Sequence, residues 1–189
     1  KYKKIPIDLD GVFTTSWHPS EEIIAFMGHK DDSSDIYVID LNSKEVTNIT
    51  NDIFSDSSPS WSSNGEVIYF TSDRGNSSQT KNMFEIDFSQ TDIFQYSFAS
   101  NKIIQLTDTE YNENYPVASS EGNLFYTSDY NGITNIFKHN LDTNESFPIT
   151  NVVTGVQQID LDGSNNLVFS GFKKRGWDLY CLLYTSDAA

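Results

Sequence analysis

The sequence has little cysteine, little basic charge and no long apolar run. Its 189 residues include one cysteine, Cys181, so no disulfide can form within the chain and a metal site built from several cysteines is excluded. No stretch of about 18 apolar residues occurs, so no transmembrane segment is predicted. The chain has 12 Lys and Arg against 27 Asp and Glu, a net charge of −15, which argues against a nucleic-acid or anionic-membrane partner because both need a basic surface.

Catalytic and metal-binding motifs are also missing. No Gly-x-Ser-x-Gly elbow of a serine hydrolase is present. The three histidines, His18, His29 and His139, have spacings unlike those of zinc ligands, and we interpret His18 as structural. Two Asp-Leu-Asp-Gly strings, at 8–11 and 160–163, resemble the start of a calcium loop, but no later Glu follows the second, so turn formation is the simpler reading. We therefore predict no catalytic residue, no cofactor and no metal.

A repeat is the main positive signal in the sequence. Asp35-Ile36-Tyr37 recurs as Asp92-Ile93-Phe94, Asn135-Ile136-Phe137 and Asp178-Leu179-Tyr180, at spacings of 57, 43 and 43. The pair Ile49-Thr50 recurs as Leu106-Thr107 and Ile149-Thr150 at the same first two spacings. Independent landmarks thus share a period of about 43 residues, with a 13-residue insertion at roughly 76–91.

Each repeat contains short apolar runs bounded by turn residues. Runs such as Val67-Ile68-Tyr69-Phe70 are rich in β-branched and aromatic residues and are too short for helices, which is typical of buried strands. Four such strands in about 43 residues are typical of one propeller blade. The predicted fold class is all-β: a β-propeller, present as a partial arc of about three and a half four-stranded antiparallel blades.

The motifs resemble a known family. Trp61-Ser62-Ser63-Asn64-Gly65, followed by Ile68-Tyr69-Phe70-Thr71-Ser72-Asp73-Arg74 and then by Asp-Ile-Phe and Leu-Thr, is similar to the WD-repeat-like propeller blades of TolB and tricorn-type proteins. The first copy lacks the Gly of the opening motif and the third lacks its Trp. The resemblance covers residues 1–180 and implies a non-catalytic scaffold that binds a protein or peptide in the periplasm or bacterial envelope. The alternative is an accessory propeller of a larger peptidase.

The repeat also predicts boundaries. We place blades at 8–50, 51–107, 108–150 and 151–180, the last without its fourth strand, and interpret residues 1–7 as the outer strand of a preceding blade. Residues 181–189 resemble a translated sequencing adapter, so we expect them to be an artefactual tail and the natural protein to continue past residue 180. The complete ring is expected to be monomeric, and the end sheets of this arc to expose faces that neighbours would cover.

Blade geometry suggests where a partner would bind. The connections between the second and third strands and those between blades leave a propeller on the same face, and loops carry function more often than strands. The insertion contains Met83-Phe84-Glu85-Ile86-Asp87-Phe88, whose alternation predicts an extra strand, either in a hairpin on that face or as a simple decoration. We interpret Asp73 and Asp129 as turn caps, and Trp17, Trp61 and Trp177 as packing residues rather than ligand-stacking ones. The candidate partner-binding residues are Asp73, Arg74, Phe84, Tyr111, Asp129, Tyr130, Lys173 and Arg175.

Overall fold

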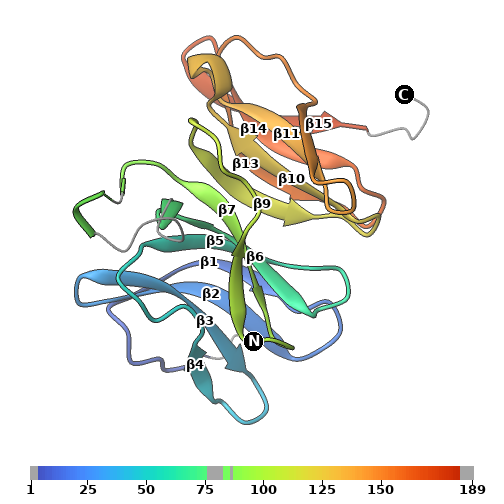
Figure 1. The fold of residues 1–189 in the computed structure, drawn as a ribbon. Coiled ribbons are helices and arrows are strands. Elements are labelled where there is room, and N and C mark those ends of the chain that lie inside the picture. Colours follow the sequence, from blue (N-terminus) through green and yellow to red (C-terminus); the bar gives the residue numbers. More distant parts are fainter. Residues whose placement is uncertain (1–3, 76–82, 86, 184–189) are drawn as a thin grey trace.

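The computed structural model describes residues 4–75, 83–85 and 87–183. Four antiparallel sheets follow one another in chain order (Figure 1), and their strands are paired in the order of the sequence. This confirms the predicted propeller arc, with three four-stranded blades and one three-stranded blade. The strands are β1 (Gly11–Trp17), β2 (Ile23–Lys30), β3 (Ser33–Asp40) and β4 (Val46–Asn48) in blade 1; β5 (Asp56–Trp61), β6 (Val67–Ser72), β7 (Asp92–Ser97) and β8 (Lys102–Gln105) in blade 2; β9 (Glu113–Ala118), β10 (Asn123–Ser128), β11 (Asn135–Asn140) and β12 (Glu145–Pro148) in blade 3; β13 (Val156–Leu161), β14 (Leu167–Lys173) and β15 (Gly176–Leu182) in blade 4.

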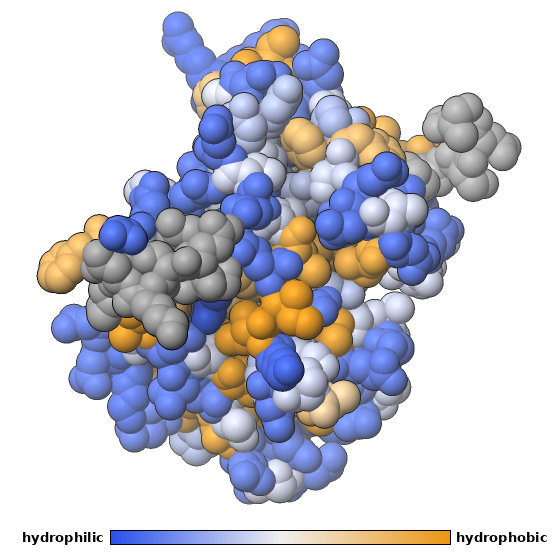
Figure 2. Space-filling view, viewed as in Figure 1, coloured by the Kyte–Doolittle hydropathy of each residue, from blue (hydrophilic) through white to orange (hydrophobic). Residues whose placement is uncertain are grey.

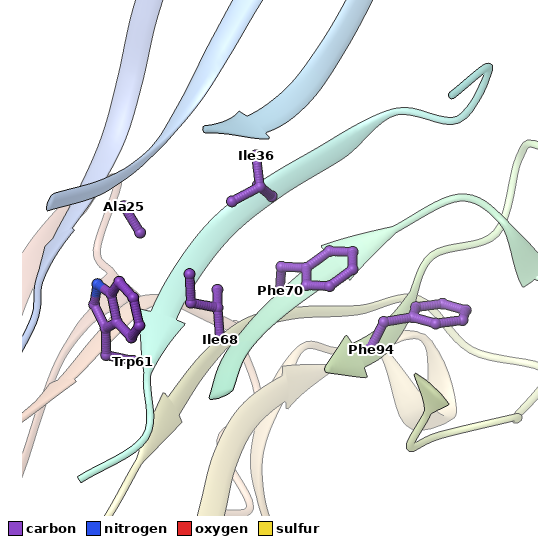
Figure 3. Packing of buried hydrophobic residues seen from close by; sticks show 6 residues of the cluster. All are labelled: Ala25, Ile36, Trp61, Ile68, Phe70 and Phe94. Atoms are coloured by element: carbon purple, nitrogen blue, oxygen red, sulfur yellow. The ribbon is translucent and has the colours of Figure 1, made fainter. Parts of the chain in front are cut away.

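In the two middle blades the second strand is apolar on both faces because a sheet lies on each side of it. In β6, Ile68 and Phe70 pack toward blade 1, whereas Tyr69 packs toward blade 3. The cluster between blades 1 and 2 contains Ala25, Ile36, Trp61, Ile68, Phe70 and Phe94 (Figure 3). A strand buried on both faces has a continuous apolar run instead of an alternating one, which is the pattern in the sequence.

The recurring Thr at the end of each repeat has a defined structural role. The Thr50 hydroxyl accepts a hydrogen bond from the Ile36 amide at 3.0 Å, and Thr107 and Thr150 accept the equivalent bonds from Ile93 and Ile136, both at 2.8 Å. These amides belong to the third strand, beyond the end of its pairing with the short fourth strand. The hydroxyl therefore satisfies a backbone donor that would otherwise be buried without a partner.

Thr150→Val tests this role because valine has the same shape and lacks the hydroxyl. We expect a loss of about 1–3 kcal/mol in the free energy of unfolding, the cost of leaving the Ile136 amide unsatisfied. Urea unfolding measures it. Thr143→Val, at an exposed turn position, is the control and should change stability by less than about 0.5 kcal/mol. Equal effects of the two substitutions would contradict the assigned role.

The opening motif of blade 2 forms a tight turn. The Gly65 amide donates to the Ser62 carbonyl at 3.0 Å, and the Val67 amide donates to the Ser62 hydroxyl at 3.1 Å. Gly65 has a φ of +75°, and a Cβ there would lie 2.1 Å from Nε2 of His18. The His18 ring also packs edge-on against Trp61 at 4.6 Å, while its Nδ1 accepts from the Ser20 and Glu21 amides. The structural interpretation of His18 is confirmed.

The tryptophan interpretation holds for one of the three residues. Trp61 is buried between blades 1 and 2, as predicted. Trp17, at the equivalent position of blade 1, is 59% exposed, because no sheet in the described residues lies on that side of it. Trp177 contacts Phe172 yet remains 50% exposed on β15. The packing prediction is therefore wrong for Trp17 and incomplete for Trp177.

The ends of the arc differ in how they are covered. Ile5, Ile7 and Leu9 pack on the outer face of blade 1 against Phe26 and Tyr37. The interpretation of residues 1–7 as an outer strand is not borne out for residues 4–7, which form no strand, since none of the strands in the described part of the chain pairs with them. Residues 1–3 lie outside that part. At the other end Leu179 is 79% exposed on the outer face of blade 4.

The C-terminal residues are partly within the last sheet. Cys181 and Leu182 belong to β15 and pair with Val168 and Leu167 of β14. Leu182 also packs against the cluster between blades 3 and 4. Residues 184–189 lie outside the described part of the chain. Their origin as a translated adapter stays a prediction.

Candidate functional site

One end of the arc gathers the loops that the sequence analysis selected. We call it the loop face and define it by the connections between second and third strands and those between blades. In each blade the two connections are tied by a hydrogen bond: Asp10 accepts from the Asp31 amide at 2.9 Å, Asp73 from the Ser55 amide at 2.7 Å, and Asp129 from the Asn112 amide at 2.8 Å. In blade 4 the Thr154 hydroxyl donates to the Phe172 carbonyl. The loops do lie together, and Asp73 and Asp129 do bind backbone amides.

The amides that Asp73 and Asp129 bind belong to the preceding inter-blade loop. This distinguishes them from ordinary turn caps, which bind their own turn. Burial raises the pKa of Asp73, while the Ser55 hydrogen bonds oppose that rise. Asp129 also accepts a second hydrogen bond, from the Asn112 side-chain amide at 3.0 Å. Both aspartates therefore fix an inter-blade loop to the connection between the second and third strands of the following blade.

Arg74 lies inside this face rather than on it. The residue is 6% exposed, and its guanidinium donates to Asp52 at 2.6 Å and to both carboxylate oxygens of Asp56 at 2.7 Å. The same guanidinium lies over the rings of Phe54, Phe70 and Phe94, at 5.2–5.5 Å from their centroids. Such a desolvated cation supports the loops above it and is not available for direct contact with a partner.

Three carboxylates meet at Arg74. Asp35, Asp52 and Asp56 each place an oxygen within 4.8 Å of the others, the kind of cluster that can hold a cation. Here the guanidinium already binds two of them. Burial raises the pKa of Asp56 to about 6 although the Arg74 charge opposes the rise, and the Asp56 and Asp52 charges give Arg74 a raised pKa despite its desolvation. The cluster thus works as a buried ion pair between blades 1 and 2.

Tyr111 and Tyr130 form an aromatic group on the loop face of blade 3. Their rings pack edge-on at 4.9 Å, and Tyr130 also contacts Phe137 edge-on at 5.9 Å. Tyr130 is 44% exposed and borders a cavity of about 450 Å³ that reaches Ile133, Pro148 and Val152. These residues offer a partly apolar surface with a hydroxyl at its edge.

The insertion does not form the predicted strand in its described residues. Met83–Glu85 forms the 3-10 turn η2, and Asp87 accepts hydrogen bonds from the Ser89 amide and hydroxyl at 2.9 and 2.6 Å. The strand prediction is wrong because Asp87 makes a turn where strand pairing was expected; residue 86 lies outside the described part. Phe84 is 99% exposed, and Phe88 stacks on Phe54 at 5.8 Å.

The remaining predicted residues lie on blade 4. Lys173 and Arg175 are exposed at the turn between β14 and β15, beside the tie from Thr154 to Phe172. They belong to blade 4, two blades along the chain from Phe84 in blade 2, so they form a separate basic edge. The turn reading of the second Asp-Leu-Asp-Gly string is confirmed, since Asp162 accepts from the Ser164 and Asn166 amides at 2.8 and 2.9 Å.

We call the first strand of each blade (β1, β5, β9 and β13) its inner strand. Sequence reasoning missed a feature that all four inner strands share. Each inner strand carries one β-bulge, at Thr14, Ser58, Tyr115 and Gln158, and all four residues have positive φ. These bulges border a cavity of about 340 Å³ between the inner strands, with Thr15, Pro116 and Ile159 in its lining. All four residues are uncharged and polar, a type that is common throughout this chain, so position in the repeat is the sequence signal that marks the bulge.

Most of the visible surface is hydrophilic, with hydrophobic residues exposed in patches (Figure 2). Within the described residues, no helix has the length and hydrophobicity needed to cross a bilayer.

Comparisons with known proteins agree with this architecture. Residues 8–151 match the family described as the TolB beta propeller domain. An uncharacterized protein of Agrobacterium fabrum is 26% identical over 149 residues, which are 79% of this chain and 43% of that protein. The chain therefore spans less than half the length of this relative.

Solved structures show the same fold at low sequence identity. TolB from Acinetobacter baumannii superposes with a TM-score of 0.71 at 16% identity, covering 91% of this chain and 41% of that one. A puromycin-hydrolyzing peptidase from Mycobacterium tuberculosis gives 0.72 at 12% identity, covering 95% and 28%. The family match covers most of the chain, and the fold agrees with it. The chain belongs to the TolB β-propeller family.

Proposed function

We propose that this chain is a non-catalytic propeller scaffold whose loop face binds a protein or peptide partner in the periplasm or another extracytoplasmic compartment of a bacterium. The observation that carries the proposal is that three connections of the loop face each expose a large apolar side chain. Ile53 is 58% exposed, Phe84 99% and Val153 81%, and each lies in a connection of the loop face. At the opposite end Phe98 is 38% exposed in a connection, and Trp17 and Leu183, at the ends of strands, are 59% and 69% exposed.

Charge suggests the chemistry of the partner. Asp31, Asp32, Asp52, Asp108 and Glu110 are exposed on the same loop face of blades 1 to 3. Their carboxylates would attract a segment that carries Lys or Arg next to apolar residues, and Tyr111 and Tyr130 would receive the apolar side chains. Aromatic residues with a polar tip are typical of protein interfaces. The partner we propose is therefore a basic, partly apolar peptide or protein loop.

The test uses peptides selected on the wild-type chain from a displayed random library. We expect them to be enriched in basic and apolar residues, and to bind the triple variant Ile53→Ser, Phe84→Ser, Val153→Ser at least about tenfold more weakly, a loss of about 1.4 kcal/mol. Fluorescence anisotropy at two salt concentrations measures the affinity, which should fall as salt rises. Trp17→Ser, at the opposite end, is the control. Equal affinity for the triple variant and the control would reject the loop face as the binding surface.

The second candidate is the accessory propeller of a larger peptidase. The observation that favours it is the similarity of this fold to the propeller-containing puromycin-hydrolyzing peptidase. The two candidates differ in the rest of the gene, which long-read sequencing of the source DNA would recover. A hydrolase elbow encoded beyond the last blade would support the peptidase, whereas a signal peptide with further blades alone would support the scaffold.

A further inference from the structure

The three junctions between blades differ in the number of buried carboxylates and in what compensates their charge. The inner strand after each junction begins with Asp56, Glu113 or Val156, and the third strand of the blade before it has Asp35, Asp92 or Asn135 at the repeated position. The carboxylates of Asp35 and Asp56 lie within 4.8 Å of each other, and those of Asp92 and Glu113 are within hydrogen-bonding reach. Between blades 1 and 2, Arg74 forms ion pairs with Asp56 and with Asp52 of the adjoining loop. Between blades 3 and 4 neither residue is charged.

The junction between blades 2 and 3 has the carboxylates without the arginine. Asp92 and Glu113 are each 1% exposed. The repeat position of Arg74 is held by Tyr130, whose ring packs against Tyr111 and Phe137 instead. Two buried carboxylates in contact cannot both be ionised at low energy, because each is desolvated and repels the other.

The hydrogen bonds around Glu113 leave one oxygen without a donor. Its Oε1 accepts from the Thr109 hydroxyl at 2.8 Å, while its Oε2 is buried and has no hydrogen-bond partner if both carboxylates are ionised. Asp92 accepts from the Gln105 amide group at 3.3 Å and the Thr109 amide at 3.5 Å. If Glu113 holds one proton, its carboxyl group can donate a hydrogen bond to Asp92. Its buried oxygen then has a partner, and the two carboxylates no longer repel each other.

The surrounding groups give the pair no positive charge. Asp108, in the adjoining loop, adds negative charge near Asp92. Tyr126 of β10 faces Glu113 as a neutral phenol, and its pKa is raised to about 12, mainly by burial. On β5 and directly after β6, Asp56 and Arg74 are bound to each other. Burial, together with the neighbouring carboxylate, raises the pKa of Glu113 to about 7, and burial raises that of Asp92 to about 6.

We propose that one proton shared between Asp92 and Glu113 locks blade 2 to blade 3, and that its loss above neutral pH weakens this junction and the loop that follows β8. That loop, residues 106–112, depends on the junction because Thr109 binds Glu113, the Glu113 amide donates to the Thr91 carbonyl at 2.8 Å, and Asn112 binds Asp129. The loop carries Tyr111, so the shape of the loop face would respond to pH. The lock itself does not depend on the proposed docking function.

The sign of the pH effect follows from proton binding. Both carboxyls hold protons more tightly in the folded chain than in the unfolded chain, so folding is favoured by acid over the range between their ordinary and raised pKa values. The wild-type folding equilibrium constant should therefore fall as pH rises from about 5 to about 7, by up to about tenfold per pH unit for one shared proton, and level off above that.

The test is urea unfolding of the whole chain at half-unit steps from pH 5 to pH 9, for wild type and Glu113→Gln. The amide of glutamine can donate to Asp92 without a titrating proton, so we expect this variant to lose the decline assigned to the pair. Glu110→Gln, an exposed carboxylate in the same loop, is the matched control and should keep the wild-type decline. A flat wild-type profile, or an unchanged decline in Glu113→Gln, would overturn the proposal.

Three further measurements extend the test. Carboxyl 13C signals of the wild-type chain should include an Asp and a Glu that titrate together near pH 6–7, which requires no variant to fold; two carboxyls that both titrate near pH 4 would overturn the shared proton. Asp92→Asn, which copies Asn135 of the next junction, should also remove the part of the decline that belongs to the pair and leave the part that comes from Asp56, whose pKa burial raises to about 6. If instead Ca²⁺ at pH 8 stabilises the wild type and not Glu113→Gln, a metal ion rather than a proton compensates the pair, and the proposal is wrong.

Discussion

Arg74→Ala is expected to destabilise the chain by about 3–5 kcal/mol. The substitution leaves Asp56, whose side chain is fully buried, without the guanidinium that donates to both of its oxygens. It also removes the cation that lies over three phenylalanine rings between blades 1 and 2. Urea unfolding followed by tryptophan fluorescence measures the loss, since Trp61 belongs to the same junction.

Two variants show whether the loss comes from the buried charge. Arg74→Met combined with Asp56→Leu removes both charges and fills the same space, and it should recover most of the stability. Arg175→Ala removes an exposed arginine from the loop face of blade 4 and should change stability by less than about 0.5 kcal/mol. If Arg74→Ala were as harmless as Arg175→Ala, Arg74 would not be a structural residue, and its role as a direct partner contact would regain support.

Trp61→Ala should also cost about 3–5 kcal/mol, because it opens a cavity at the junction of blades 1 and 2. Trp61 packs edge-on against His18 and stacks on Phe98 at 5.3 Å, so its loss removes contacts to both blades. Thermal and urea unfolding measure the effect. The urea m-value should not change if the folded variant buries as much surface as the wild type does.

Trp17→Ala is the matched control because Trp17 has the same repeat position and is 59% exposed. It should change stability by less than about 1 kcal/mol. Trp61→Phe should cost much less than Trp61→Ala, since it keeps most of the ring and removes an indole N–H that has no partner in the described residues. Similar losses for Trp17→Ala and Trp61→Ala would mean that the exposure of Trp17 does not describe the chain in solution.

Most of the fold could be predicted from the repeat. The run Val67-Ile68-Tyr69-Phe70 is apolar on consecutive residues because β6 is covered on both faces, and the Leu-Thr ending recurs because its hydroxyl binds the third strand. The strand expected within 83–88 was wrong because alternation also occurs in turns, and only a neighbouring strand decides between them. The exposure of Trp17 was missed because position in a repeat does not show whether a neighbouring sheet is present.

The candidate site was predicted less completely. The repeated Asp73 and Asp129 were correctly read as residues that bind backbone amides, but the amides belong to a loop 17 or 18 residues earlier in the chain. Arg74 was taken for a surface residue since it follows a turn, while the structure buries it between two blades. The equivalence of Asp56, Glu113 and Val156 could have been found from the repeat, had charged positions been aligned as well as apolar ones.

The sequence by itself determined the β-propeller fold and the face on which the variable loops lie, because those follow from a period of about 43 residues and from strand order. The family was indicated by the resemblance of the blade motifs to those of TolB-type propellers. Only the tertiary structure decided which charges are buried and how each is balanced. Asp56 and Glu113 look alike in the sequence, yet one faces Arg74 and the other faces Asp92. The difference arises because the energy of a buried charge depends on groups brought together across a blade junction, and no local pattern encodes that junction.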